Sequence, residues 1–389
     1  MTATQAPARD VAAVYDEVTD GLRRPLRVSE LVYAVADRFP DRLPSRRAID
    51  GEREHLQRDK QGLEIAQGAF VAEVLADPVR GLHLLHAMAR PLPEALERLP
   101  AFAAAGSVDL GPVRLDRDGP LGRITLQGHA TLNAEDDDAV HAMEVAIDLV
   151  LLDDAIEIGV LRGGVCEHPR YAGRRVLGSG VNLSALYRGR ISLVEFMLER
   201  ELGYMAKVKA GHAPEAFARV EDPESPREKP WIAAVDAFAI GGACQWLLVM
   251  DHVVAEAGAS LTLPARREGV IPGCASLRLP RFVGEARSRA AILLNRGFVA
   301  GSPEGRLIAG DVVATSDEVG ATVDRVAAEL IDAGHTSLLA NRRALRAAQE
   351  PLPVFRRYLS TYARDQARCL YSPELIANLE AHWERRERA

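Results

Sequence analysis

The chain has 389 residues, of which 48% are hydrophobic, and a formal net charge of −7. A chain of this length can bury a large core and a smaller satellite, so we expect two or three domains. The acidic balance gives no electrostatic reason to expect nucleic acid or an anionic membrane surface as a partner.

The cysteines and the N-terminus bear on the compartment. The four cysteines are scattered without a Cys-x-x-Cys pair, which predicts neither a disulfide framework nor a zinc site and fits a reducing cytoplasm. The N-terminus has acidic residues where a signal peptide needs an apolar run, and no stretch is long enough to span a bilayer. We therefore expect a soluble, cytoplasmic protein.

Residues 1–108 have a helical pattern. Apolar residues recur three and four apart in RVSELVYAVADRF and in IAQGAFVAEVLADPVRGLHLLHAMA, and prolines separate such segments. His83 and His86 are three apart in the second of these, but with no third ligand nearby a helix face is favoured over a metal site. The pattern predicts an all-helical N-terminal domain.

Strands and helices alternate over residues 109–325. VRLDRDGPLGRITLQ predicts two short strands around a turn, and EIGVLRG, WIAAVDAFAIGG and LTLPARREG predict further strands. A long amphipathic segment, EDDDAVHAMEVAIDLVLLDD, precedes the first of these three. Such alternation favours an α/β domain with helices packed on sheets. The pattern then turns helical again, which predicts a C-terminal helical region over residues 326–389.

Two glycine-containing turns stand out in the α/β part. In RRVLGSGVNLSAL a short strand runs into Gly178-Ser179-Gly180, and a helix then opens with Asn182 or Ser184 as its cap. In AVDAFAIGGACQWLLVMD, Gly241-Gly242 joins a strand to a buried helix. Glycine lets a ligand approach the backbone, and a helix N-terminus adds a positive dipole end. Either turn alone is also explained as an ordinary strand-to-helix connection.

Five motifs in order resemble the crotonase (enoyl-CoA hydratase/isomerase) superfamily. The longest is Lys229-Pro230-Trp231-Ile232-Ala233-Ala234-Val235 followed by Ala239-Ile240-Gly241-Gly242. The others are Leu132-Asn133-Ala134, Ser179-Gly180-Val181-Asn182-Leu183, Ile271-Pro272-Gly273 and Leu279-Pro280-Arg281-Phe282-Val283-Gly284. The resemblance implies a crotonase (ββα spiral) core and an acyl-CoA substrate. It also implies that the amides of Val181 and Gly242 polarise the thioester carbonyl as an oxyanion hole.

Two positions depart from the hydratases of that superfamily. Gln245 and Ala265 stand where the hydratases carry the glutamates that handle water and a proton. A neutral amide and a methyl group cannot act as general base or acid. Hydration of an enoyl-CoA by the usual pair is therefore disfavoured.

These departures match one subgroup. The chain resembles the cofactor-independent 3,5-dihydroxyphenylacetyl-CoA dioxygenases of glycopeptide-antibiotic biosynthesis, including at Gly203–Lys207, Glu268–Gly273 and Ala340–Leu345. The resemblance implies conversion of the arylacetyl-CoA and O2 to an arylglyoxylate and CoA without metal or flavin. The absence of dinucleotide, phosphate-loop and zinc motifs agrees with this. A thioester hydrolase or isomerase acting without O2, and a non-catalytic scaffold, remain as alternatives.

The subgroup also suggests polar site residues. Glu135 directly follows Leu132-Asn133-Ala134, although a carboxylate near a helix N-terminus explains it equally well. His168 precedes the first glycine turn, and the alternative is a surface-loop histidine. Gln245 lies in the first turn of the buried helix, with a polar core residue as its alternative.

Arg200 lies on an apolar stripe at helical spacing, formed by Leu193, Phe196 and Tyr204. An arginine on such a face should have a buried anionic or phenolic partner, unless its side chain reaches past the stripe to solvent.

Apolar and basic positions complete the predicted site. Leu183, Ala265 and Val270 are candidates to line a small space for O2, although core packing explains them as well. Arg174 and Arg175, in a locally basic stretch, are candidates to hold the CoA phosphates. By analogy with the superfamily we expect a homotrimer or a dimer of trimers, assembled through the C-terminal helices.

Overall fold

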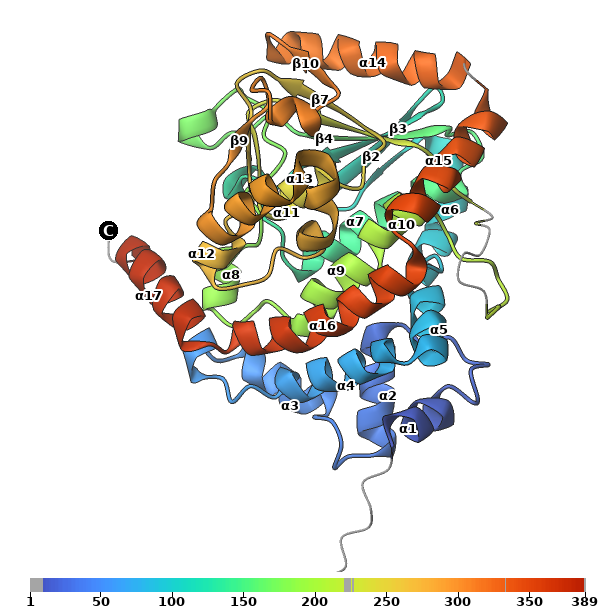
Figure 1. Ribbon diagram of the computed structural model, residues 1–389, viewed down its shortest axis with the longest axis vertical. Coiled ribbons are helices and arrows are strands. Elements are labelled where there is room, and N and C mark those ends of the chain that lie inside the picture. Colours follow the sequence, from blue (N-terminus) through green and yellow to red (C-terminus); the bar gives the residue numbers. More distant parts are fainter. Residues whose placement is uncertain (1–9, 220–224, 226, 333, 388–389) are drawn as a thin grey trace, which may run out of the picture.

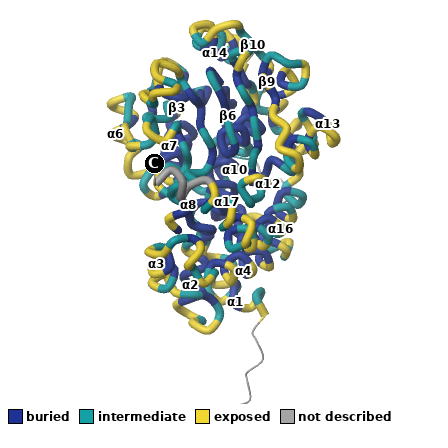
Figure 2. The backbone as a smooth tube through the Cα atoms, turned by 90° about the vertical axis from the view of Figure 1, so that its left-hand side faces the viewer, coloured by how far each residue is buried: buried dark blue, intermediate teal, exposed yellow. Residues whose placement is uncertain are grey.

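The computed structural model describes residues 10–219, 225, 227–332 and 334–387. In Figure 1 the helices from the start of the chain gather at one end of the molecule and the sheets at the other. Helix α16, from near the C-terminus, runs between the two parts. Figure 2 shows that buried backbone continues through this junction, so the two parts share a core.

The N-terminal part is helical, as predicted. Helix α2 buries Leu31, Val32 and Val35 on one face, which is the face that the apolar spacing in the sequence indicates. Asp77 caps α5 by accepting hydrogen bonds from two backbone amides, and Pro78 occupies its first position. The helices are α1 (Val11–Val18), α2 (Val28–Arg38), α3 (Arg46–Arg53), α4 (Glu64–Ala76), α5 (Pro78–Met88) and α6 (Pro93–Ala105).

The larger sheet has the strand order β1-β2-β3-β4-β5-β7-β10. Its first three strands pair antiparallel, and the pairs from β3 onward are parallel. The strands are β1 (Ser107–Asp109), β2 (Val113–Asp118), β3 (Leu121–Leu126), β4 (Ile158–Gly163), β5 (Trp231–Val235), β7 (His252–Glu256) and β10 (Asp311–Val313).

Both faces of this sheet are covered. Side chains alternate between the faces, so Leu161 and Ala233 join the main core while Val160 and Ile232 join a second cluster. Helix α7 (Asp137–Leu152) belongs to the main core, and α14 (Ser316–Asp332) packs on the opposite face. Because both faces are covered, the sequences of the parallel strands are continuous apolar runs.

A smaller sheet, in the order β6-β8-β9, continues from the end of β5. Its strands are β6 (Phe238–Ile240), β8 (Ser260–Thr262) and β9 (Phe298–Val299). The chain leaves β6 through Gly241 into α11 (Gly242–Leu247), and a bridge between Gly178 and Ala239 brings the other glycine turn alongside. The predicted α/β architecture is therefore confirmed.

The remaining helices link the sheets and complete the C-terminal part. They are α8 (Leu183–Tyr187), the π-helix η4 (Leu193–Leu198), α9 (Glu199–Leu202), α10 (Tyr204–Ala210), α12 (Ala265–Glu268), α13 (Ala275–Leu294), α15 (His335–Gln349), α16 (Leu352–Leu370) and α17 (Pro373–Glu387).

Helix α16 packs closely along α4. A Cβ at Gly68 would lie 2.5 Å from Ala367 Cβ and 2.7 Å from the Ala363 carbonyl oxygen, so only glycine permits this approach. The predicted domain limits fall inside β1 (residues 108/109) and inside α14 (residues 325/326), and the three-part division stays a prediction. Trimer formation through the C-terminal helices likewise stays a prediction.

No helix in the part of the chain that the structure describes has the length and apolar character to cross a membrane.

A buried ionic cluster joins the helical part to α7 and α10. Lys207 Nζ lies 2.7 Å from a Glu144 oxygen and 2.8 Å from an Asp148 oxygen. These three side chains are at most 2% exposed. Arg27, from the start of α2, lies 2.8 Å from Glu144, and His212 lies 2.8 Å from Asp148. Removing one member would leave opposite charges buried without compensation.

We therefore predict that Lys207→Met lowers the free energy of unfolding by about 3–5 kcal/mol, because both carboxylates lose a buried cation. Arg98→Ala breaks an exposed pair with Glu94 and serves as the control, with an expected loss of about 0.3–0.5 kcal/mol. Urea unfolding followed by circular dichroism measures both. Equal losses in the two variants would contradict a supporting role for the cluster.

Candidate active site

The two glycine turns lie directly against each other. A Cβ at Gly180 would lie 3.3 Å from the Ile240 carbonyl oxygen and 3.5 Å from the Gly242 nitrogen. Gly180 and Gly241 have φ angles of +89° and +55°, a region that disfavours other residues. Both backbone conformation and close approach therefore require glycine here.

Two backbone amides at these turns are free to donate. The Glu135 amide donates to the Gly180 carbonyl at 2.8 Å, and the Asn182 amide donates to the Glu135 carbonyl at 2.7 Å. This bridge holds the backbone on both sides of Val181. The amides of Val181 and Gly242 donate no hydrogen bond to any of the residues described. Gly242 is the first residue of α11, where the helix leaves its amides without internal partners.

The cap of α8 is Asn182. Its side-chain oxygen accepts a hydrogen bond from the Ala185 amide at 3.1 Å, which decides between the two candidates that the sequence offers. The first glycine turn therefore leads directly into a capped helix.

The Arg200 guanidinium is buried beside the second turn, with 4% of its side chain exposed. Its Nη2 donates to the Gly242 carbonyl at 2.8 Å, and its Nη1 donates to Gln245 Oε1 at 2.8 Å. It also pairs with Glu135 Oε2 at 3.2 Å and with Glu201 Oε1 at 2.6 Å. Burial opposes its charge, but the facing Glu135, Tyr204 and Glu201 raise the pKa of Arg200 above its usual value.

Glu135 lies at the centre of this group. Its Oε1 accepts hydrogen bonds from Tyr204 Oη at 2.8 Å and from Trp246 Nε1 at 3.3 Å. The Tyr204 and Trp246 rings stack with centroids 4.7 Å apart. Burial raises the pKa of Tyr204 well above its usual value, so the phenol remains a donor. A Cβ at Gly242 would lie 1.9 Å from Glu135 Oε2, so the carboxylate sits against the second turn.

The turn at Ile271-Pro272-Gly273 closes over Gln245 and Glu201. A Cβ at Gly273 would lie 2.3 Å from Glu201 Oε1 and 2.4 Å from Gln245 Oε1. The Cys274 amide donates to Glu201 Oε2 at 3.1 Å, and Tyr358 from α16 donates its hydroxyl to the Gly273 carbonyl. The C-terminal helices thus reach the site through this turn.

The predicted apolar positions are only partly brought together. Ala265 is 4% exposed at the start of α12, and the Val270 amide donates to its carbonyl at 2.9 Å. Leu183 is the first residue of α8 and is half-buried, like Val270. A space shared by all three stays a prediction.

His168 contacts its own loop. Its Nδ1 accepts a hydrogen bond from the Arg170 amide at 3.3 Å, and its ring lies 6.2 Å from that of Tyr171. Tyr171 in turn packs on Phe238 of β6, the strand that leads to the second glycine turn. No contact of His168 with Glu135 or Arg200 is found within the described ranges.

The two arginines predicted to hold CoA lie apart from the Arg200 group. Arg174 is exposed and pairs with Glu256 at 2.6 Å. Arg175 donates to the Gly163 carbonyl at 3.1 Å and, with Arg123 and Arg162, lines a cavity of about 160 Å³ between the larger sheet and α14. Binding of CoA by either residue stays a prediction.

The stripe that carries Arg200 is not one regular helix. It runs through the π-helix η4 and α9 to Tyr204, the first residue of α10, and the chain breaks at Gly203 between α9 and α10. A Cβ at Gly203 would lie 2.8 Å from a Glu144 oxygen and 2.5 Å from the Glu199 carbonyl, so the chain breaks where the buried carboxylate approaches. Such π-turns are frequent at functional sites.

Sequence reasoning did not assign roles to Tyr204, Trp246 and Glu201. One sequence feature could have indicated Tyr204, because it is four residues after Arg200 on the predicted stripe. For Trp246 and Glu201 the only sequence feature is that they are adjacent to Gln245 and Arg200, since their partners come from distant parts of the chain.

The histidines at positions 83 and 86 have other partners. His83 Nδ1 lies 2.7 Å from Tyr15 Oη, and His86 Nε2 lies 2.8 Å from the Pro214 carbonyl oxygen. Over the residues whose placement is described, no group of three or more His, Cys, Asp and Glu side chains could hold a metal ion.

Comparison with known proteins gives concordant matches. Residues 222–368 match the family model "Enoyl-CoA hydratase/isomerase". The chain is 45% identical over 368 residues to (3,5-dihydroxyphenyl)acetyl-CoA 1,2-dioxygenase of Amycolatopsis orientalis, covering 94% of this chain and 82% of the relative. It is 29% identical over 201 residues to a probable enoyl-CoA hydratase of Rhizobium meliloti (strain 1021), covering 51% of this chain and 68% of that one.

Solved structures of the same fold match the larger part of the chain. Pseudomonas aeruginosa OdaA matches with a TM-score of 0.58 and 22% identity, covering 70% of this chain and 99% of that one. An enoyl-CoA hydratase from Mycobacterium avium subsp. paratuberculosis K-10 matches with a TM-score of 0.57 and 20% identity, covering 71% and 97%.

Glu268, the last residue of α12, has a partly buried carboxyl and lies three residues after Ala265. Burial raises its pKa from 4.5 to about 7, and the neighbouring Arg267 only partly opposes this. The folded state therefore binds more protons than the unfolded state between pH 4.5 and pH 7. Stability that is present at low pH is lost as the pH rises through 7.

We predict that Glu268→Gln removes this dependence, because glutamine does not titrate. As the pH rises from 4.5 to 7.5, the unfolding free energy of the variant minus that of the wild type should increase by roughly 1–3 kcal/mol. Urea unfolding at several pH values measures the difference. The exposed Glu285→Gln should follow the wild type throughout, and parallel curves for Glu268→Gln and the wild type would contradict the assignment.

Proposed function

The chain belongs to the crotonase (enoyl-CoA hydratase/isomerase) superfamily, which confirms the fold predicted from its motifs, and from this premise we propose its activity. It is a dioxygenase that converts 3,5-dihydroxyphenylacetyl-CoA and O2 to 3,5-dihydroxyphenylglyoxylate and CoA. The observation that carries this proposal is the high identity, over most of both chains, to the Amycolatopsis dioxygenase. Gln245 and Ala265 at the hydratase carboxylate positions agree with it.

In the proposed reaction the amides of Val181 and Gly242 donate to the thioester carbonyl oxygen. They stabilise the enolate that forms when a proton leaves the adjacent carbon. Each such donor contributes roughly 2.7–4 kcal/mol to transition-state stabilisation. Two observations support this role. The two turns lie against each other, and neither of these backbone amides donates a hydrogen bond to a described residue.

Glu135 is our candidate for the group that accepts the proton. Its carboxylate lies against Gly242, and hydrogen bonds from Arg200, Tyr204 and Trp246 fix its position. A base must be held within hydrogen-bond reach of the proton that it removes. Its position beside one of the two proposed oxyanion donors supports this role.

Arg200 acts as a positioning residue. It holds the Gly242 carbonyl and Glu135 together, and it donates a hydrogen bond to Gln245 Oε1. The Gln245 amide nitrogen is then the end that remains for the substrate. His168 remains a proposed polar site residue, and its loop packs through Tyr171 on Phe238 of β6, the strand that leads to the second glycine turn.

The substrate supplies the electrons and O2 is the oxidant, so the proposed reaction needs no other redox partner. The aryl-stabilised carbanion gives its electron pair to O2 and forms a peroxide on the α-carbon. The terminal oxygen attacks the thioester carbonyl, and CoA leaves as its thiolate. Cleavage of the O–O bond with loss of the second α-proton yields the arylglyoxylate. Both oxygen atoms are incorporated, and the enzyme's task is to bind, orient and dry the site.

No cofactor enters this scheme, so we propose that the enzyme works without metal or flavin and that O2 is a co-substrate. Leu183, Ala265 and Val270 are proposed to line the O2 space, and Arg174 and Arg175 to contact the CoA phosphates. A homotrimer or a dimer of trimers, in the cytoplasm, is proposed by analogy with the superfamily.

The activity predicts O2 uptake by metal-free protein supplied with 3,5-dihydroxyphenylacetyl-CoA, with one CoA released per O2 consumed. An oxygen electrode and a thiol assay measure the two quantities, before and after treatment with a chelator. Absence of O2 uptake with this thioester would overturn the proposal. Release of CoA under strict anaerobiosis would instead indicate a thioester hydrolase that uses the same amides.

Another prediction concerns the contact between the turns. Gly180→Ala should lower kcat roughly 10²–10³-fold, because its φ of +89° disfavours alanine and the added Cβ would crowd the Ile240 carbonyl oxygen at 3.3 Å, so the turn that carries the Val181 amide must shift. Gly119→Ala is the matched control, since Gly119 also has positive φ (+57°) but no atom within 4 Å of its Cβ position. Steady-state kinetics and thermal unfolding of both variants separate the effects. Equal activity in the two variants would contradict the hypothesis that this contact positions the oxyanion donors.

A further inference from the structure

A second cavity lies away from the glycine turns, where the N-terminal helices, α10 and the C-terminal helices meet. Its volume is about 230 Å³, and it is lined by residues of α5 and α10, by residues between 211 and 218 with Ser225, and by the segment from Arg346 to Phe355. None of the residues of the candidate active site lines it. The cavity is therefore a separate feature of the fold.

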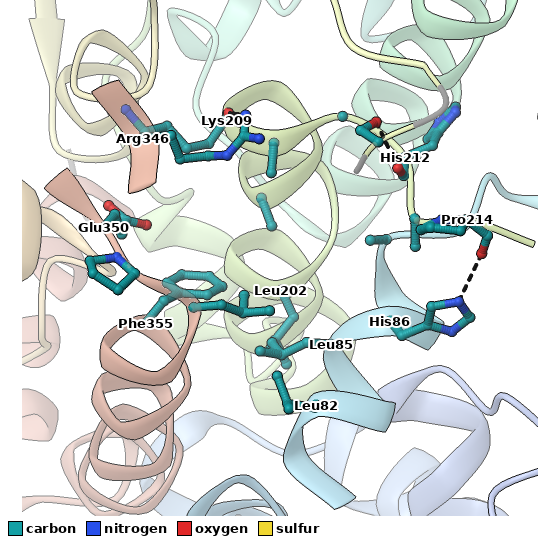
Figure 3. Close-up of a pocket in the computed structure, with 18 of the residues that line it drawn as sticks. Leu82, Leu85, His86, Leu202, Lys209, His212, Pro214, Arg346, Glu350 and Phe355 are labelled. Carbon is teal, nitrogen blue, oxygen red and sulfur yellow. Dashed lines mark hydrogen bonds between the residues drawn. The ribbon is translucent and has the colours of Figure 1, made fainter. Parts of the chain in front are cut away.

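The walls of this cavity are largely apolar at one end. In Figure 3 the side chains gathered there are Leu82, Leu85, Leu202 and Phe355. Apolar surface of this kind favours a ligand with a hydrocarbon or aromatic body.

The other end carries positive charge. Figure 3 shows Lys209 and Arg346 together there. Arg346 is neutralised by Glu228 at 2.5 Å, and Arg278, also in the wall, is neutralised by Glu350 at 2.8 Å. Lys209 has no ion pair or hydrogen bond from its ammonium to any residue that the structure describes. Lys209 is half-buried, and this burial lowers the pKa of its ammonium to about 8.

The partly buried Lys209 ammonium makes no direct ion pair, although the carboxylates of Glu350 and Asp251 favour its charge from beyond ion-pair distance, so a ligand carboxylate in direct contact would stabilise it further. The apolar walls and the Lys209 ammonium together suit a single ring with a short acid side chain. A polar ligand without an apolar body would make no apolar contacts with the leucine and phenylalanine side chains of the wall.

We propose that this cavity binds a small aromatic monocarboxylate, with its carboxylate on Lys209 and its ring among Leu82, Leu85, Leu202 and Phe355. The site is independent of the dioxygenase activity proposed above, although an arylglyoxylate belongs to the same chemical class. Leu202 is two residues from Arg200, so an occupant would contact the helical segment that carries the positioning arginine.

Binding of 4-fluorophenylacetate to the full chain, followed by ¹⁹F NMR line broadening and calorimetry, tests this proposal. We expect saturable binding by the wild type and at least a tenfold loss of affinity in Lys209→Met. Lys209→Arg, which keeps the charge, should bind within about threefold of the wild type. Lys60→Met is the matched control, because Lys60 is also a partly buried lysine but lies outside the cavity, and it should bind normally.

Two further variants locate the ligand. Ala206→Phe fills the cavity from α10 and should abolish binding even if Lys209→Met is poorly folded. Gly180→Ala alters the candidate active site and should leave binding unchanged. The proposal is overturned if no saturable binding is seen, if Lys209→Met binds like the wild type, or if only Gly180→Ala loses affinity. Binding of octanoate but not of the aromatic acid would also overturn it.

Discussion

The Arg200 guanidinium is buried, and a buried charge is tolerated only where opposite charge and hydrogen bonds compensate it. Here the compensation comes from Glu135 and Glu201, from the Gln245 side chain and from the Gly242 carbonyl. These partners belong to different segments, so satisfying one guanidinium draws the segments together. The backbone of the second glycine turn is held by the same group that orients the nearest carboxylate. A conformational shift in any partner would leave a charge unpaired in a medium of low dielectric constant.

The close contact between the glycine turns depends on the sheets beneath them. Strand β6 continues from β5, and its bridge to Gly178 brings the first turn beside the second. At this contact a side chain on Gly180 would be crowded against the Ile240 carbonyl, and Glu135 occupies the space beside Gly242. Oxyanion stabilisation needs donors that are already in place before charge develops. Paired strands, tight turns and a buried ionic network supply that condition.

The helical parts at the two ends of the chain support the same region. Helices α4 and α16 pack closely at Gly68, and α16 reaches the Gly273 turn through Tyr358. The Lys207 cluster connects α2 to α7 and α10, on the far side of Gly203 from Arg200. The added helices therefore do more than cover the sheet, since they fix the segment that carries the positioning arginine. The same junction encloses the cavity at Lys209.

The sequence by itself determined the α/β alternation, the helical ends, the two glycine turns and the loss of both hydratase carboxylates. Those features are local, because periodicity, turn chemistry and motif residues lie within short stretches of chain. Only the tertiary structure decided which side chains meet. Glu135 joins Arg200 and Trp246 across 65 and 111 residues, and Tyr204 became its partner through a π-helix and a break at Gly203 that the apolar spacing did not predict. Such contacts follow from packing between distant segments, which no local pattern records.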